Sequence, residues 1–150
     1  MYGVVDTGFG EMYFLDRLHD DHYAVGFNID GVSWLYEGVF DEAKLIMTLK
    51  YVIAGKGMIE NGMLESVFYD KSGDRFSLTY STATSPTQIY TVEGKNRQTV
   101  VRHTQERILG VPEEWLAPGE DASFTSYDGT RTSARLYLPA PVLDYKGKRP

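Results

Sequence analysis

Two histidines come nearest to a chemical site in this sequence. His19 and His22 lie in the stretch LHDDHY, with Asp20 and Asp21 between them. Imidazole nitrogens and carboxylate oxygens bind metal ions, and they also carry out acid–base chemistry. The spacing is typical of a turn between two strands, and the sequence names no third ligand. We therefore expect a solvated turn, with a metal or acid–base site as the alternative.

Other catalytic groups have no recognisable context. No serine lies in a G-x-S-x-G pentapeptide, and all of them fall in or beside a predicted strand or turn. They are Ser33, Ser66, Ser72, Ser77, Ser81, Ser85, Ser123, Ser126 and Ser133. The acidic neighbours Asp20–Asp21, Asp41–Glu42 and Glu113–Glu114 point to opposite faces of a strand. The segment GKGMIENG lacks the context of a P-loop, and His103 alternates with Val101 as a structural residue would. We expect no catalytic, cofactor-binding or metal-binding residue, and no cofactor.

Composition and charge indicate a globular, β-rich chain. The 150 residues include 15 Lys and Arg against 21 Asp and Glu, a net charge of -6 with the signs interspersed. This charge pattern argues against a nucleic-acid partner, and Lys146, Lys148 and Arg149 are expected to form a solvated end. There is no cysteine, no apolar run of membrane-spanning length and no signal-peptide pattern at the start. We expect a cytoplasmic protein with no membrane partner.

A weak internal repeat relates residues 20–40 to residues 72–92. With a one-residue slip in its second half, the repeat matches Tyr23–Phe76, Phe27–Tyr80, Leu35–Ile89 and Tyr36–Tyr90. Each block contains four runs rich in β-branched and aromatic residues. The runs are EMYFLDRL, HYAVGFNI, SWLYEGVF and LIMTLKYVI, then LESVFYD, RFSLTYST, TQIYTVE and QTVVRHT. Four strands in roughly 50 residues is the pattern of a β-propeller blade.

We therefore predict an all-β fold with a partial β-propeller over residues 1–104, as two four-stranded blades at about 1–55 and 56–104. The segment that begins at Asp41, DEAKLIMTLKYVIAG, contains good helix formers. Its place in the repeat favours a strand. The turn Thr84–Gln88 contains Pro86 and is expected to be a plain connection, with a ligand contact as the alternative.

Beyond Thr104 the character of the chain changes. Residues 105–119 contain two prolines and read as a linker that packs through its apolar side chains. Those side chains are Ile108, Leu109, Trp115 and Leu116. Residues 120–150 open with ASFTS and TRTSARLYLP around an Asp128–Gly129 turn, a strong hairpin signal. A two-stranded hairpin is marginal alone, so this one needs further strands.

The stretch YDKSGDRFSLTYSTATSPTQIY and the later ERILGVPEEWLAPGEDASFTSYDGTRTSARLYLPAP resemble part of a known family. They resemble the junction of propeller and catalytic domain in serine peptidases of the prolyl oligopeptidase family, in its acylaminoacyl-peptidase and dipeptidyl-aminopeptidase-like branch. The most specific part is SYDGTRTSARLYLP. The resemblance is strong from about Leu64 onward and rests on the blade pattern alone before it.

The resemblance implies that residues 120–150 open an α/β-hydrolase domain. The family's oxyanion loop and its Ser, Asp and His follow later, and the sequence stops at KGKRP before them. It further implies a non-catalytic fragment whose partners are the rest of the propeller, the hydrolase domain and peptide substrates. In the intact protein the propeller restricts access to short peptides. The alternative is a free-standing β-rich binding module, which would have no use for the hairpin.

Two isolated blades would leave apolar residues without neighbours. We expect partial exposure of Leu35, Phe40, Phe68, Ile89 and Trp115. Poor solubility of the separate chain follows from that exposure.

Overall fold

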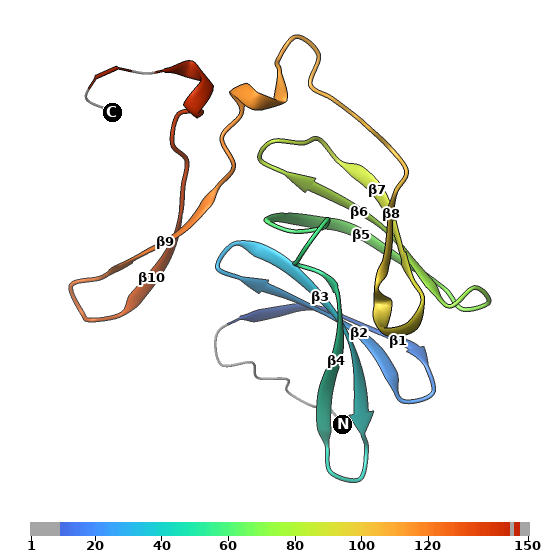
Figure 1. Ribbon diagram of the computed structural model, residues 1–150. Coiled ribbons are helices and arrows are strands. Elements are labelled where there is room, and N and C mark those ends of the chain that lie inside the picture. The colour runs from blue at the N-terminus through green and yellow to red at the C-terminus, as the bar shows by residue number, and fades with distance from the viewer. Residues whose placement is uncertain (1–9, 145, 148–150) are drawn as a thin grey trace.

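The computed structural model describes residues 10–144 and 146–147, and their regular structure is β-strand with three single turns of 3-10 helix (Figure 1). The expected all-β class is confirmed. The strands are β1 (Glu11–His19), β2 (His22–Ile29), β3 (Val32–Asp41), β4 (Ile46–Ala54), β5 (Gly62–Asp70), β6 (Arg75–Thr82), β7 (Gln88–Glu93), β8 (Thr99–Arg102), β9 (Glu120–Thr125) and β10 (Arg131–Leu136). The 3-10 turns are η1 (Lys95–Arg97), η2 (Glu113–Trp115) and η3 (Pro141–Leu143).

Strands β1–β4 and β5–β8 form two antiparallel meanders, each in sequential order. All eight predicted runs are strands. The one-residue slip in the repeat is visible in the register, since Phe27 pairs with Trp34 in the first sheet while Tyr80 pairs with Gln88 in the second. The repeat therefore reflects the same local construction, although none of the three sheets is closed on itself.

The helix-like segment after Asp41 is a turn and a strand. Strand β3 runs to Asp41, whose Oδ1 accepts a hydrogen bond of 3.0 Å from the Lys44 backbone N–H. Leu45 then adopts a φ of +57° before β4 begins at Ile46. The aspartate thus caps a tight hairpin turn in place of a helix, because β4 gains a full ladder with β3. The predicted strand is confirmed.

The two sheets pack against each other around one apolar core. The buried members from the first sheet and its following loop are Leu18, Ala24, Leu35, Ile53, Ala54 and Ile59, and those from the second are Phe76, Leu78, Tyr80, Tyr90 and Val92. The expectation that Leu35 would be exposed is wrong, because its side chain is fully buried in this core. Ile89 holds the equivalent register position in the second sheet but points outward and is 45% exposed.

Phe68 and Ile89, two of the side chains expected to be partly exposed, lie on the outer face of the second sheet. Strand pairing places Phe68 opposite Ser77, Ser77 opposite Thr91 and Thr91 opposite Val101, in one row across the sheet. Phe68 is 67% exposed and Val101 is 41% exposed. Trp115, in η2, is 52% exposed, while Phe40 is half-buried. This face of β5–β8 therefore leaves a row of partly apolar side chains without a partner among the described residues.

The segment between the second sheet and the hairpin is held mainly by polar contacts. Buried Gln88 donates to the Glu106 carbonyl (2.8 Å), and its Oε1 accepts from the Thr104 hydroxyl and the Glu106 N–H. Ile108 and Leu109 were expected to pack, yet they are 44% and 95% exposed. Trp115 is also about half exposed, so the expectation is wrong for these three side chains, because the segment arches over the end of the sheet (Figure 1). Leu116, the fourth, is half-buried.

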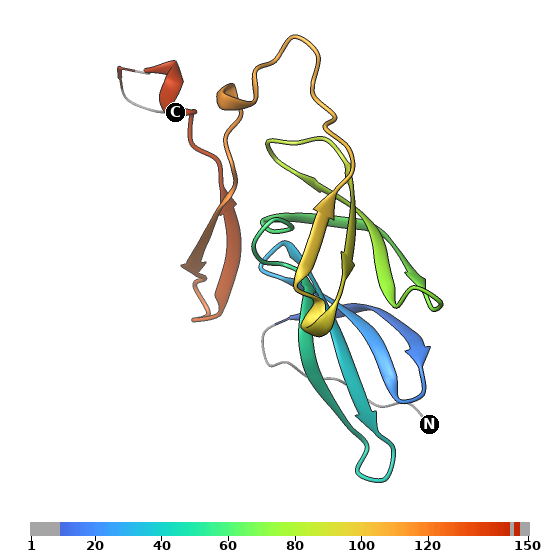
Figure 2. The same cartoon turned by 45° about the vertical axis from the view of Figure 1, so that its right-hand side comes forward.

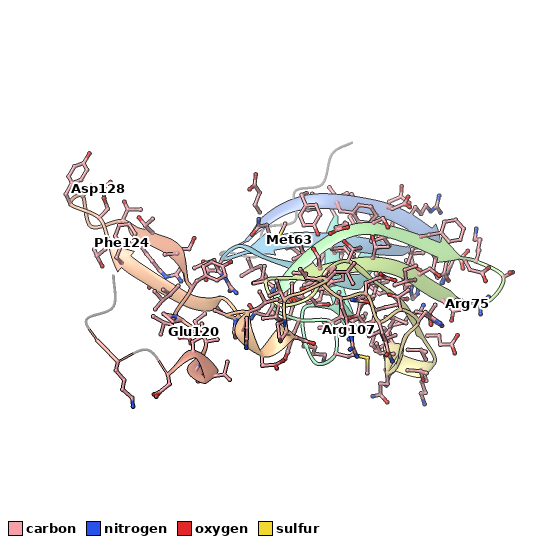
Figure 3. The ribbon with its side chains drawn as sticks, turned by 90° about the horizontal axis from the view of Figure 1, so that it is seen from above. Met63, Arg75, Arg107, Glu120, Phe124 and Asp128 are labelled. Carbon is pink, nitrogen blue, oxygen red and sulfur yellow. The ribbon has the colours of Figure 1, made fainter. Side chains whose placement is uncertain are left out.

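Strands β9 and β10 form the predicted hairpin, which stands beside the two sheets (Figure 2). Phe124 and Asp128 lie toward its outer end, away from the sheets (Figure 3). Arg131 makes a two-point ion pair with Asp30 in the turn between β2 and β3, at 2.9 and 3.0 Å. Arg135 bonds the Asn61 side chain. The hairpin is thus tethered by side chains and shares no ladder with either sheet.

No helix in the described part of the chain is long and apolar enough to span a bilayer. In the tail, Lys146 is exposed and pairs with Asp144 at 3.1 Å. Lys148 and Arg149, expected in the solvated end, lie outside the described residues.

Candidate functional site

The two histidines of the LHDDHY turn lie on one face of the first sheet. His19 ends β1 and His22 begins β2, and they are direct cross-strand partners. Because cross-strand partners share a face, their rings stack with centroids 4.5 Å apart and an interplanar angle of 24°. Asp20 and Asp21 are exposed, as expected for a solvated turn, but the imidazoles are only 31% and 29% exposed.

Glu37 of β3 supplies the third group that the sequence did not reveal. It is paired with Ala24, two residues along β2 from His22, so alternation along the strand brings Glu37 to the same face. Its Oε1 lies 2.8 Å from His22 Nδ1. The other oxygen, Oε2, accepts a hydrogen bond of 2.5 Å from Arg97 Nε. Both oxygens of a carboxylate that is only 3% exposed are therefore partnered.

Arg97 of η1 links this face to the second sheet. Its side chain is 4% exposed. Besides Glu37, it donates to the Asp74 carbonyl oxygen and to Asp74 Oδ1, both at 2.7 Å, and its guanidinium lies 5.1 Å from the Phe76 ring centroid. Tyr69 donates its hydroxyl proton to the same Asp74 oxygen at 2.7 Å. One arginine thus joins a carboxylate of the first sheet to a carboxylate of the second.

The electrostatics of the cluster follow from these contacts. Burial works against the charged form of Arg97, but the hydrogen bonds to Glu37 and Asp74 outweigh burial and raise the pKa of the guanidinium. The hydrogen bond from Arg97 lowers the pKa of Asp74. Burial, with the hydrogen bond to the Asp74 carboxylate, raises the pKa of Tyr69 to about 12. At neutral pH Arg97 is therefore charged, beside an ionised Asp74 and a neutral Tyr69 phenol.

Sequence reasoning missed Glu37 and Arg97 for identifiable reasons. Glu37 interrupts an apolar run, SWLYEGVF, and a lone acid at a predicted buried position is the one available signal. Arg97 lies in the polar segment GKNR, which resembles an ordinary surface turn. Asn96 and Arg97 have φ values of +60° and +56°, so both adopt the left-handed conformation. Nothing in the sequence predicts this conformation at Arg97.

In the described part of the chain, no serine hydroxyl is hydrogen-bonded to His19, His22 or Glu37. Ser66, Ser72 and Ser85 bond Thr79, Asp70 and the Pro86 carbonyl, respectively. Within the described residues, the hydroxyl–imidazole hydrogen bond is that of Thr91 with His103 Nε2, at 2.9 Å. That pair is exposed. The backbone N–H of His103 donates to the Ile89 carbonyl and so continues the pairing of the sheet. His103 therefore has the structural position expected for it.

The turn Thr84–Gln88, considered as a ligand contact, contributes to a shallow cavity of about 570 Å³. Thr84, Ser85 and Pro86 form one wall, and the segment from Glu106 to Leu116 forms the other. The side-chain amide of Gln88, at the end of the turn, donates to the Ser85 hydroxyl oxygen and the Glu106 carbonyl. The polar groups of this turn hold the chain in place, as in a plain connection.

Comparisons with protein-family models and with curated proteins find no match to the chain. The resemblance to the prolyl oligopeptidase family therefore stays a prediction.

Proposed function

We propose that this chain forms two adjacent blades of a β-propeller in a serine peptidase of the prolyl oligopeptidase family, followed by the hairpin that opens its hydrolase domain. Its role in that protein is to pack on the catalytic domain and to restrict access to short peptides. On this proposal, residues 1–104 belong to the propeller, residues 105–119 are the linker and the hairpin begins at Glu120. The chain itself is non-catalytic.

One observation carries the proposal. Two successive four-stranded meanders with the same strand order pack face to face, and they are followed by a connecting segment and a hairpin in the order that the resemblance implies. The free outer row that contains Phe68 and Val101 supports the same proposal, because a further blade would cover it. The most exposed large side chain of the hairpin, Tyr127, also lies free for a neighbouring domain.

The proposal is tested by the reading frame and by an assay. Sequencing the source gene past the codon for Pro150 should find an HGGP-like loop and a G-x-S-x-G elbow; a stop codon directly after it contradicts the proposal. The purified 150-residue chain should release no product from chromogenic aminoacyl and acyl-peptide substrates above a buffer blank. Hydrolysis above the blank, unaffected by further purification, contradicts the non-catalytic role.

A free-standing β-rich binding module is the second candidate, and the tethering of the hairpin favours it. Asp30 and Asn61 hold Arg131 and Arg135, so the hairpin has partners within the chain. A groove of about 360 Å³ runs between the hairpin and the sheets, and it is lined in part by Trp34. If the module is self-contained, the purified chain should be a stable monomer; self-association through the free sheet face argues for the peptidase fragment.

A further inference from the structure

We propose that His19, His22 and Glu37 bind a divalent transition-metal ion, with zinc the best fit. This inference is independent of the proposed function, since it concerns side chains at the contact between the two sheets and needs no peptidase domain. Among the residues that the structure describes, these three are the group of His, Cys, Asp and Glu whose ligand atoms come together, all within 4.8 Å of one another.

The distances match what a small rearrangement would need. Zinc bonds imidazole nitrogen and carboxylate oxygen at about 2.0–2.2 Å, so two ligands of a tetrahedral site lie about 3.3 Å apart. His22 Nδ1 and Glu37 Oε1 are 2.8 Å apart and share a hydrogen bond, so an opening of about 0.5 Å lets the metal replace the shared proton. The three ligand atoms are at present spread over up to 4.8 Å, so the widest pair must close by about 1.5 Å. A tilt of the partly exposed His19 ring, which is stacked on His22, supplies this movement.

The surrounding structure already holds these ligands in place. Strand pairing fixes His19 opposite His22 across a two-residue turn in which Asp20 adopts a φ of +42°. Arg97 binds Glu37 Oε2 and leaves Oε1 directed at the imidazoles. A ligating carboxylate whose second oxygen is hydrogen-bonded is a common arrangement in metal sites, because it fixes the direction of the first oxygen.

Charge around the cluster favours a cation. The exposed carboxylates of Asp20 and Asp21 lie 3.4 and 3.8 Å from the nearest nitrogens of His19 and His22. Arg97 and Arg17 are the opposing charges: Asp74 also binds Arg97, and the Arg17 side chain donates to the Asp20 carbonyl at 2.8 Å. The metal would thus meet more carboxylates than cations at close range, which lowers the free energy of a divalent ion there.

The ligand set selects the class of metal. Two imidazoles and one carboxylate suit zinc and other late first-row ions, whereas magnesium and calcium prefer sets of oxygen ligands. Both imidazoles reach the surface, so water can complete the coordination. A site with three protein ligands and one water is the pattern of an open zinc centre.

The test is a zinc titration of the whole 150-residue chain, followed by competition with a chromophoric zinc indicator. One equivalent should bind. His19→Phe keeps a planar ring beside His22 and Tyr69 but removes a ligand, and it should weaken binding at least 10-fold. The matched control, His103→Phe, changes the exposed histidine on the second sheet and should leave the affinity within about twofold of wild type.

A second readout needs no variant. In NMR spectra of the imidazole groups, zinc should shift the resonances of His19 and His22 and leave those of His103 in place. The proposal is overturned if zinc binds without saturating at one equivalent, if His19→Phe binds as tightly as wild type, or if all three imidazoles respond alike. If His19→Phe does not fold, the wild-type spectra decide the matter alone.

Discussion

The buried pair of Glu37 and Arg97 gives the sharpest stability prediction. Their side chains are 3% and 4% exposed, and they join residues 60 positions apart. Arg97→Met keeps an apolar side chain of similar reach but removes the charge, together with the guanidinium that lies over Phe76. The Glu37 carboxylate then stays buried, with His22 as its one remaining hydrogen-bond partner among the described residues. Breaking a buried ion pair from one side costs about 3–5 kcal/mol, so we expect Arg97→Met to lower the free energy of unfolding by that amount.

The assay is urea denaturation followed by circular dichroism at pH 7, with a chelator present so that no metal contributes. The double variant Glu37→Gln/Arg97→Met removes both charges. We expect it to be more stable than the sum of the single variants predicts, with a coupling of at least about 1 kcal/mol. Arg131→Met is the matched control, because its partner Asp30 holds it at the surface, where the arginine is 60% exposed. Such a solvent-exposed pair contributes little to stability, so we expect Arg131→Met to change the free energy of unfolding far less than Arg97→Met does.

The reasoning is refuted if Arg97→Met costs no more than Arg131→Met. That outcome would mean that water or a shifted side chain replaces the guanidinium, and that the contact between the sheets rests on the apolar core alone. A coupling near zero in the double variant would likewise show that Glu37 and Arg97 act independently.

Three further predictions concern the second sheet. Tyr80→Phe should cost about 1–3 kcal/mol at pH 7, because the buried hydroxyl accepts the Gly62 N–H at 2.9 Å. Burial raises the pKa of Tyr80 to about 12, so the folded state keeps the phenol proton above pH 10, where the unfolded chain loses it. Between pH 9 and 11 wild type should therefore lose about 1 kcal/mol more of its unfolding free energy than Tyr80→Phe does; equal losses in the two urea series would contradict this. Gly62→Ala should destabilise by about 1–3 kcal/mol in the same assay, since a Cβ there would overlap the Ser81 carbonyl oxygen, and unchanged stability would count against that overlap. Phe68→Ser should reduce self-association in analytical ultracentrifugation while changing the free energy of unfolding by less than about 0.5 kcal/mol. Unchanged association would show that a different surface of the chain mediates it.

The strands could be predicted from the sequence because their signals are local. β6 occupies the predicted run RFSLTYST, and β9 and β10 flank the predicted Asp128–Gly129 turn. Alternating apolar residues and turn formers encode such elements within a few positions of each other. The segment after Asp41 is the case in which local propensity was misleading. Its residues favour a helix, but it forms a strand because it pairs with β3.

Burial was harder to predict because it depends on docking. Leu35 and Ile89 occupy equivalent register positions, yet one is fully buried and the other is 45% exposed. The sequence pattern assigned exposure to both. Which face of a strand becomes the inner one is decided by the partner sheet, and here the first sheet turns Leu35 toward the core while the second turns Tyr90 toward it.

The sequence by itself determined an all-β chain of repeated four-strand units and a final hairpin, because strand period and turn chemistry act over a few residues. Only the tertiary structure decided that His19 and His22 meet Glu37, and that Glu37 meets Arg97 from the other sheet. These residues lie up to 78 positions apart, from His19 to Arg97, and no local rule relates them. Docking of the two sheets brings them together, because a buried carboxylate must find a charged or hydrogen-bonding partner wherever the packing supplies one.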